Sequence, residues 1–168
     1  MMATADGALW VQWLQANAAS PSAYDVALAR SRDGGMTWTQ ITRVNDDQAA
    51  SEHGFAALWP RSVNSIGIAW LDGREQQMAH DTEQKENAHH GGAMQLRANG
   101  FDMDLARGGD ALVDARVCDC CQTDAATSDR GVLLAWRDRG EDEVRDIVVA
   151  RLQEDGAWTK PVPVHADG

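Results

Sequence analysis

Eight residues, Ser31 to Trp38, constrain the fold of this chain more than any other stretch. They fit the pattern Ser-x-Asp-x-Gly-x-Thr-Trp at every specified position, namely Ser31, Asp33, Gly35, Thr37 and Trp38. Asp33 can accept backbone N–H bonds across a tight turn, and Gly35 can adopt the positive φ that such a turn requires. Trp38 then begins the outgoing strand and can pack its indole ring beneath the turn. The stretch therefore predicts a β-hairpin.

This pattern resembles the Asp box, or BNR repeat, of sialidase-like β-propellers. The resemblance implies an all-β fold of the six-bladed sialidase type, in which each blade is a four-stranded sheet. It also implies that the Asp box is structural, because in that family the box lies away from the catalytic face. An ordinary Asp-Gly-Gly hairpin is the alternative that the residues leave open.

The chain also repeats itself. Three strand-like runs end in tryptophan, at 9–13, 66–70 and 132–136, and the terminal tryptophans lie 57 and 66 residues apart. Each run is followed by a second alternating run, at 25–30, 93–97 and 146–151, as expected of half-buried strands. Two further runs, at 54–59 and 123–127, are predicted to be the innermost strands of their blades. At the turn that follows the second run, 98–101 and 154–158 resemble degenerate Asp boxes with an Asn-Gly or Asp-Gly pair.

Counting these units gives about two and a half to three blades, with approximate bounds 1–48, 49–113 and 114–168. A propeller hides its sheet edges by closing into a ring, and 168 residues are too few for six blades. We therefore expect the chain to be a fragment of a longer protein. The remaining propeller blades or a partner chain would be needed to close the ring. The polar stretch 74–92 is expected to be a surface loop inserted in the second unit.

Charge and hydropathy exclude some partners. The formal net charge is −11, so a nucleic-acid partner is not expected, since such a partner needs a basic surface. A few clustered arginines can still bind a carbohydrate or another small ligand that carries a carboxylate. No apolar run is long enough to predict a membrane span, and no signal peptide is visible. Exported Asp-box relatives and the clustered cysteines together favour a periplasmic or secreted location.

Blade topology predicts which loops share a face. Asp72 and Arg74 leave one blade where Arg137 and Asp138 leave the next, so these four are the candidate catalytic residues. Arginines bind carboxylates in a bidentate fashion, and two aspartates flanking a sugar suit glycoside hydrolysis. The arginines can instead form salt bridges with neighbouring acidic residues, and each aspartate can simply close its own turn.

The resemblance itself transfers no catalytic residue. Sialidases of the family use an arginine triad, a tyrosine nucleophile with a glutamate partner and an acid/base aspartate. The early Arg-Ile-Pro motif of that family is absent here. The only tyrosine, Tyr24, precedes an outer strand, where a catalytic role is not expected.

All three cysteines fall within four residues, at Cys118, Cys120 and Cys121. Clustered thiolates suit copper(I) or zinc, with His53 as a further candidate ligand. We interpret the spacing of the three cysteines as different from the Cys-x₂-Cys pair that is typical of zinc sites. A vicinal disulfide between Cys120 and Cys121, a bridge to a cysteine elsewhere, and inert buried thiols are the alternatives.

Two classes of function follow as expectations. The first is an exo-glycosidase of the sialidase superfamily that acts on glycoconjugates. The second is a non-catalytic propeller that binds a ligand, a protein or a metal through the Cys118–Cys121 cluster. Most tryptophans are expected to pack in the core, and Trp59, beside Pro60, is the one that we regard as a possible ligand platform.

Overall fold

The computed structural model describes residues 1–18, 20, 23–76 and 92–165, and these form an all-β protein of three four-stranded sheets. The N-terminal sheet holds β1 (Met2–Ala3), β2 (Leu9–Ala16), β3 (Tyr24–Ser31) and β4 (Thr42–Arg43). The middle sheet holds β5 (His53–Pro60), β6 (Ile66–Asp72), β7 (Gln95–Phe101) and β8 (Ala111–Asp114). The C-terminal sheet holds β9 (Asp124–Ser128), β10 (Gly131–Arg137), β11 (Ile147–Arg151) and β12 (Val162–Pro163).

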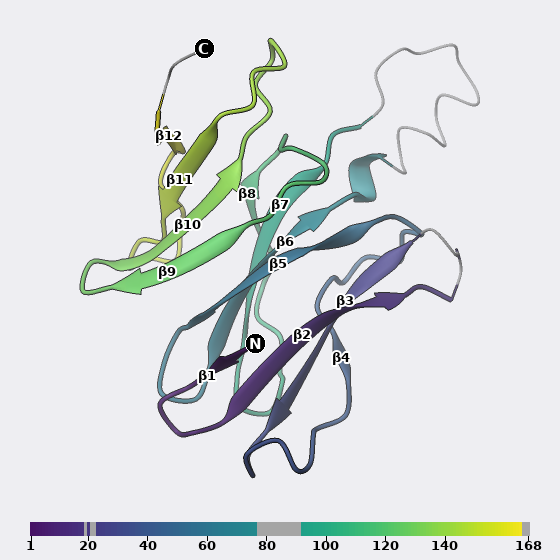
Figure 1. The fold of residues 1–168 in the computed structure, drawn as a ribbon, viewed down its shortest axis with the longest axis vertical. Helices are drawn as coiled ribbons and strands as arrows, with labels where there is room; N and C mark the ends of the chain where they lie inside the picture. The colour runs from purple at the N-terminus through teal and green to yellow at the C-terminus, as the bar shows by residue number, and fades with distance from the viewer. Residues whose placement is uncertain (19, 21–22, 77–91, 166–168) are drawn as a thin grey trace.

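Each sheet is an antiparallel meander in which strands pair in the order of the sequence. Figure 1 shows the three sheets arranged side by side, with the middle sheet between the other two. This arrangement confirms the prediction of an all-β chain built from four-stranded units, and it is consistent with propeller blades. The described residues form no closed ring, so sheet faces at both ends of the row lie open.

The middle sheet is buried on both faces, and β6 shows why. Its alternate residues Ile66, Ile68 and Trp70 pack against the N-terminal sheet, in a cluster that includes the fully buried Trp10. Ala69 and Leu71 point to the opposite face and pack against the C-terminal sheet. Successive side chains of a strand point to opposite faces, so apolar residues at both odd and even positions indicate that the strand is buried on both faces.

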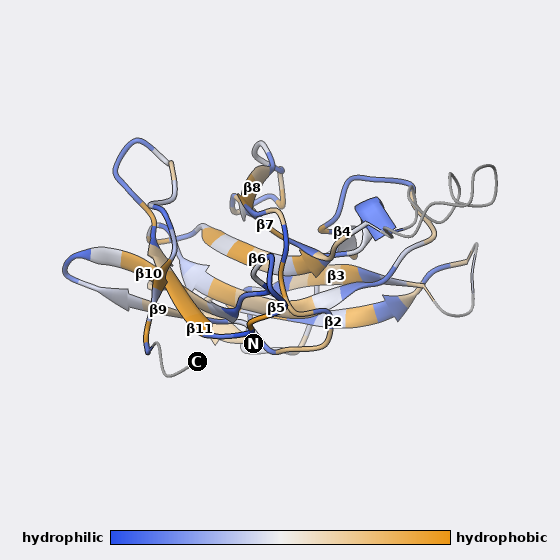
Figure 2. Cartoon of the chain, turned by 90° about the horizontal axis from the view of Figure 1, so that it is seen from above, coloured by the Kyte–Doolittle hydropathy of each residue, from blue (hydrophilic) through white to orange (hydrophobic). Residues whose placement is uncertain are grey.

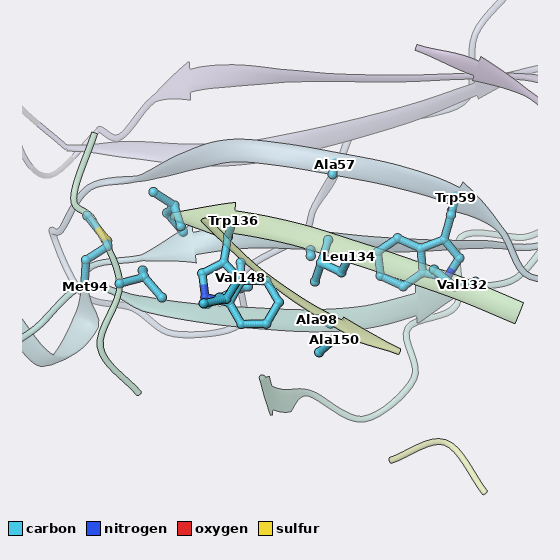
Figure 3. Close-up of a cluster of buried hydrophobic side chains, with 13 residues drawn as sticks. Ala57, Trp59, Met94, Ala98, Val132, Leu134, Trp136, Val148 and Ala150 are labelled. Atoms are coloured by element: carbon cyan, nitrogen blue, oxygen red, sulfur yellow. The ribbon is translucent and has the colours of Figure 1, made fainter. Parts of the chain in front are cut away.

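The core between the middle and C-terminal sheets is drawn in Figure 3, where Trp59 and Met94 lie at opposite ends of the cluster and Trp136 lies between them. Val132, Leu134 and Val148 extend into it from the C-terminal sheet. Figure 2 shows the same organisation by hydropathy, with apolar residues along the strands and polar residues mainly in the connections. Two separate cores, one on each side of β6, therefore hold the three sheets together.

The segment 31–38 forms the turn that its sequence predicts. The Asp33 carboxylate accepts the backbone N–H of Thr37 at 2.9 Å and the Thr37 hydroxyl at 2.5 Å. Gly35 has a φ of 93°, a conformation that favours glycine. The two bonds from Thr37, and to a smaller extent the bond that the Ser31 hydroxyl donates to Asp33, hold the pKa of Asp33 at about 2, below its usual range. Trp38 donates its indole N–H to the carbonyl of Gly35 at 3.2 Å but precedes β4 rather than beginning it.

The C-terminal sheet has a turn at the corresponding place, closed by a shorter hydrogen-bonded loop. Asp155 accepts the backbone N–H of Ala157 at 2.9 Å, and Gly156 has a φ of 87°. The threonine that follows each tryptophan also plays the same part in both sheets. Thr39 accepts the N–H of Arg30 at 3.0 Å, and Thr159 accepts that of Arg151 at 3.0 Å.

The prediction of a turn at 98–101 was wrong. Asn99 and Gly100 lie inside β7, and the turn comes later, where Asp102 accepts the N–H of Ala106 at 2.8 Å. Leu105 has a positive φ of 62° in that turn, a conformation that an Asn-Gly search does not find. Gly100 serves a different purpose: the guanidinium of Arg61 lies where a Cβ on this residue would stand, 1.8 Å from Nη1.

Part of the predicted surface loop at 74–92, namely 77–91 with His80, His89 and His90, lies outside the described residues. Among the residues that are described, no helix has the length and apolar character to cross a membrane.

Candidate functional site at the cysteine cluster and its neighbouring charges

The loops that were predicted to share a face do meet. The segment between β8 and β9 runs alongside the end of β10, because the N–H of Cys118 donates to the carbonyl of Arg137 at 3.0 Å. Asp119, one residue on, lies 3.5 Å from Nη1 of Arg139. It also accepts a bond of 3.4 Å from the side chain of Gln76, which follows β6. Loops of the middle and C-terminal sheets therefore join around the cysteines.

The three cysteines form one compact group, with each Sγ within 4.8 Å of the other two. A disulfide joins Cys118 to Cys121, while Cys120 is a free, solvent-exposed thiol. The vicinal disulfide considered from the sequence is therefore not the one that forms. Cys118 and Cys121 stand at Cys-x-x-Cys spacing, so the statement that the run lacks such a pair was also wrong. Reading the first and last cysteines as a pair would have found it.

Arg137 is the cation beside this cluster. Its Nη1 lies 3.9 Å from Sγ of Cys121, and its Nε donates to the carbonyl of Arg145 at 2.9 Å. After reduction of the disulfide, a guanidinium at this position would stabilise the negative charge of a Cys121 thiolate. Arg139, by contrast, is held by Glu143 at 2.9 Å, and this hydrogen bond raises the pKa of Arg139 further.

His53 belongs to a different group of side chains. Its Nε2 lies 2.9 Å from Oδ2 of Asp47 and 3.6 Å from Oδ1 of Asp72, and its Nδ1 lies 3.0 Å from the carbonyl oxygen of Tyr24. A carboxylate and a carbonyl both accept hydrogen bonds, so both ring nitrogens must donate and the imidazole is protonated. Both nitrogens are thereby occupied, and His53 has no lone pair for a metal bound at the cysteines.

Asp72, a candidate catalytic residue, is fully buried and bonded on both oxygens. The Arg74 guanidinium donates hydrogen bonds of 2.8 Å to Oδ1 and 2.7 Å to Oδ2 of Asp72. The indole N–H of Trp70 adds a third bond, of 2.9 Å, to Oδ2. Burial with paired hydrogen bonds is the usual state of a structural carboxylate.

Arg74 makes three further ion pairs: with Asp47 at 3.0 Å, with Asp46 at 3.3 Å and with Asp110 at 3.7 Å. Its guanidinium therefore faces four carboxylates, which hold the pKa of Arg74 well above its usual range through the Asp72 hydrogen bond above all. The alternative that the sequence left open for the arginines, salt bridges to acidic residues, is the one that applies to Arg74. Its partners are mostly not the expected ones, since Asp46 and Asp47 come from the segment between β4 and β5.

A second arginine completes the charged network. Arg107 binds Asp46 at 2.8 Å, makes a short ion pair with Asp110 and donates from Nε to the carbonyl of Val44 at 3.1 Å. The Arg107 hydrogen bond lowers the pKa of Asp46 to about 2. No motif in the sequence marks Arg107, because Asp46 and Val44 reach it from a stretch about 60 residues earlier in the chain.

The protonation states fit this geometry. Burial opposes the charge of His53, but the hydrogen bond that His53 donates to Asp47 and the charges of Asp72 and Asp47 outweigh it and raise the pKa of His53. Burial raises the pKa of Asp110, with opposition from Arg107, and its Oδ2 has no hydrogen-bond partner among the described residues. Three cations thus face four carboxylates, and burial favours the protonated form of one of these, Asp110.

Asp47, His53 and Asp72 lie close enough together to hold a metal ion by distance alone. The chemistry of their surroundings argues against it, since Arg74 already binds both carboxylates and would repel a cation. Asp138, the remaining catalytic candidate, is half-buried and accepts the N–H of Arg139 at 2.7 Å. It is the only one of the two candidate aspartates that solvent reaches.

No protein-family model matches the chain, and no curated protein matches it either.

Proposed function

We propose that this chain is part of a propeller whose Cys118–Cys121 cluster is a thiol-based site for a soft metal ion, copper(I) or zinc. The observation that carries the proposal is the mutual approach of the three sulfur atoms within 4.8 Å. Thiolates around one zinc ion at about 2.3 Å stand roughly 3.8 Å from one another in a tetrahedral arrangement. The loop therefore needs only small adjustments to place three sulfurs on one ion.

The surroundings support this choice of ligand chemistry. Cys120 is exposed and Cys118 is buried, so the group has one side open to an incoming ion and one side fixed by β10. Arg137 lies beside Cys121 and favours its thiolate form. Three thiolates without imidazole or carboxylate suit copper(I) best among common metals, with zinc the second choice.

The proposed site has two states. With Cys118 and Cys121 joined as a disulfide, only the Cys120 thiol is left to bind an ion. Two electrons from a thiol reductant break the Cys118–Cys121 bond to give two thiolates, and loss of the Cys120 proton gives a third, so metal affinity follows the redox state of the pair. A disulfide of this kind persists in oxidising compartments, which supports the proposal of a periplasmic or secreted location.

Metal content and free thiols, measured together on the same chain, test the proposal. Reduced protein should bind about one copper(I) per chain by mass spectrometry, and the bound metal should protect all three thiols from titration. The double variant Cys120→Ser, Cys121→Ser should lose that metal. His53→Asn is the matched control, since both nitrogens of His53 are bonded elsewhere, and it should keep the metal. Unchanged metal in the cysteine double variant would overturn the proposal.

For the scaffold, we infer a segment of a six-bladed, sialidase-like propeller, supported by the hydrogen-bonded turn at 31–38 and its counterpart at 154–158. The exo-glycosidase activity that the resemblance implies stays a prediction. Asp72 has no free oxygen with which to transfer a proton to a sugar, so this activity would depend on Asp138 and on residues elsewhere. Turnover of a fluorogenic sialoside that disappears in Asp138→Asn would favour the enzyme over the metal-binding protein.

A further inference from the structure

A pocket lies between the middle and C-terminal sheets, at the opposite end of β5 from His53. It has a volume of about 80 Å³, and its walls include Trp59, Arg61, Asn99 and Trp158. The eight residues of β5 span roughly 25 Å, so the pocket is remote from His53 at the start of that strand. Nothing in the proposed metal site uses it.

Two hydrogen-bond donors at this pocket have no partner among the described residues. Trp59 is only 2% exposed, yet its indole N–H donates to no acceptor. Arg61 is exposed, and its guanidinium makes neither an ion pair nor a hydrogen bond to a described side chain or carbonyl. A buried N–H left unbonded is unfavourable, so a ligand oxygen that accepts a hydrogen bond from it gains affinity.

Two glycines place these donors next to each other. The Trp59 indole lies over Gly67, because a Cβ on that glycine would stand 2.3 Å from Nε1. The Arg61 guanidinium lies over Gly100, where a Cβ would stand 1.8 Å from Nη1. Gly67 and Gly100 are direct register partners on β6 and β7. Partners in an antiparallel pair point their Cβ positions to the same face about 5 Å apart, so the two donors lie on one face of the sheet, within about 10 Å of each other.

A carboxylate matches this arrangement. Its two oxygens can accept one bond from the guanidinium and one from the indole N–H, and its single negative charge balances the single unpaired cation. The other walls are aromatic: Trp158 meets Trp59 edge to face, with ring centroids 5.8 Å apart and planes at 89°. Such walls accept the flat or apolar body that carries the carboxylate.

We propose that the pocket between Trp59, Arg61 and Trp158 binds a small organic carboxylate, with the Arg61 guanidinium and the Trp59 indole N–H as the two donors. The chain segment after β5 supports the position of Arg61, since its N–H donates to the carbonyl of Ser65 at 2.9 Å. Asn99 does not compete for the ligand. Its amide donates to Asp110 at 2.6 Å, and its carbonyl oxygen accepts the N–H of Gly100.

Benzoate is the probe that tests the proposal, and benzamide is its uncharged counterpart. Titration of the full chain, followed by the indole N–H signals in nitrogen–proton NMR spectra, should move one indole signal in a saturable way. Trp59→Phe assigns that signal by removing it. Benzamide should bind at least about tenfold more weakly, since it lacks the charge that strengthens the hydrogen bond to Arg61.

Arg61→Gln should weaken benzoate binding at least about tenfold, the usual contribution of a hydrogen bond between charged groups. Arg32→Gln is the matched control, because Arg32 is an exposed arginine on a turn of the N-terminal sheet, and it should leave affinity unchanged. Arg61 is exposed, so its variant is expected to fold even if Trp59→Phe does not. Equal affinity for benzoate and benzamide, tighter binding of inorganic phosphate, or an Arg61→Gln variant that binds like the parent would each overturn the proposal.

Discussion

Arg74 and Arg61 lie near opposite ends of the middle sheet and show how differently two arginines of one sheet can be used. Arg74 follows β6 and faces four carboxylates, two of which it shares with His53. Arg61 follows β5 and has no carboxylate partner among the described residues, with an aromatic pocket beside it instead. The first arginine closes a charged network, whereas the second leaves a positive charge for something outside the protein.

The difference teaches that an arginine on a predicted functional face is not by itself an anion clamp. The sequence favoured Arg74 as a ligand-binding residue because of the face on which its loop lies. Its charge is nevertheless balanced by four carboxylates, of which Asp72 is fully buried, and an incoming carboxylate would have to compete with Asp72 for the same guanidinium. An unbalanced charge beside unbonded donors is the better criterion, and Arg61 satisfies it.

The largest expected effect on the free energy of unfolding comes from removing Arg74, the arginine whose charge is balanced by carboxylates. Arg74→Met leaves the fully buried Asp72 and the neighbouring Asp47 without their main cation, which should destabilise the fold by about 3–5 kcal/mol. Arg61→Met, the matched substitution at the other end, should change the free energy of unfolding by less than about 0.5 kcal/mol. Urea denaturation of both variants measures the contrast, and similar losses in the two would contradict it.

The two glycines beneath the pocket give the next largest effect. Gly67→Ala places a Cβ about 2 Å from the rigid indole of Trp59 and should cost about 1–3 kcal/mol of stability. Gly100→Ala meets the flexible end of Arg61, which can swing away, so its cost should be well below that. Benzoate affinity should nonetheless fall in Gly100→Ala, because the guanidinium is displaced. A stable Gly100→Ala variant with full affinity would place the ligand elsewhere.

The pH dependence of stability tests the contribution of His53, which shares two carboxylates with Arg74. The pKa of His53 is raised in the folded chain, so the stability that its charge contributes is fully present below the pKa of an unfolded histidine, about 6.5. That contribution is lost as pH rises through the higher folded pKa. Unfolding free energies measured from pH 6 to 9 should therefore fall in the parent and fall less in His53→Asn. Parallel profiles for the two proteins would show that His53 is not the group responsible.

The smallest effect is expected at the Asp-box turn. Asp33→Ala removes the acceptor of the Thr37 bonds on an exposed hairpin and should lower the melting temperature by about 2–4 °C. The low pKa of Asp33, about 2, means that the stabilisation is present above the unfolded pKa and disappears as pH falls toward 2. Thermal melts at pH 7 and pH 2.5 should thus differ less in the variant than in the parent.

Local patterns predicted the elements of this fold well. Alternation and terminal tryptophans located β2, β6 and β10, and the eight residues from Ser31 to Trp38 encode their own hydrogen bonds. These successes have one cause, which is that the interacting atoms lie within a few residues of one another. The same logic misplaced one turn, since Asn99-Gly100 has turn chemistry but lies in β7, where Gly100 makes room for Arg61.

The sequence by itself determined that the chain is all β, built from repeated four-stranded units, and that its cysteines form a single cluster. Tertiary structure alone decided which of the charged residues are satisfied. Asp46, Asp47 and Asp110 reach Arg74 from segments far apart in the chain, and no acidic residue in the described part of the chain pairs with Arg61. Charge balance depends on distances of a few ångströms between segments remote in sequence, and only the packing of the sheets sets those distances.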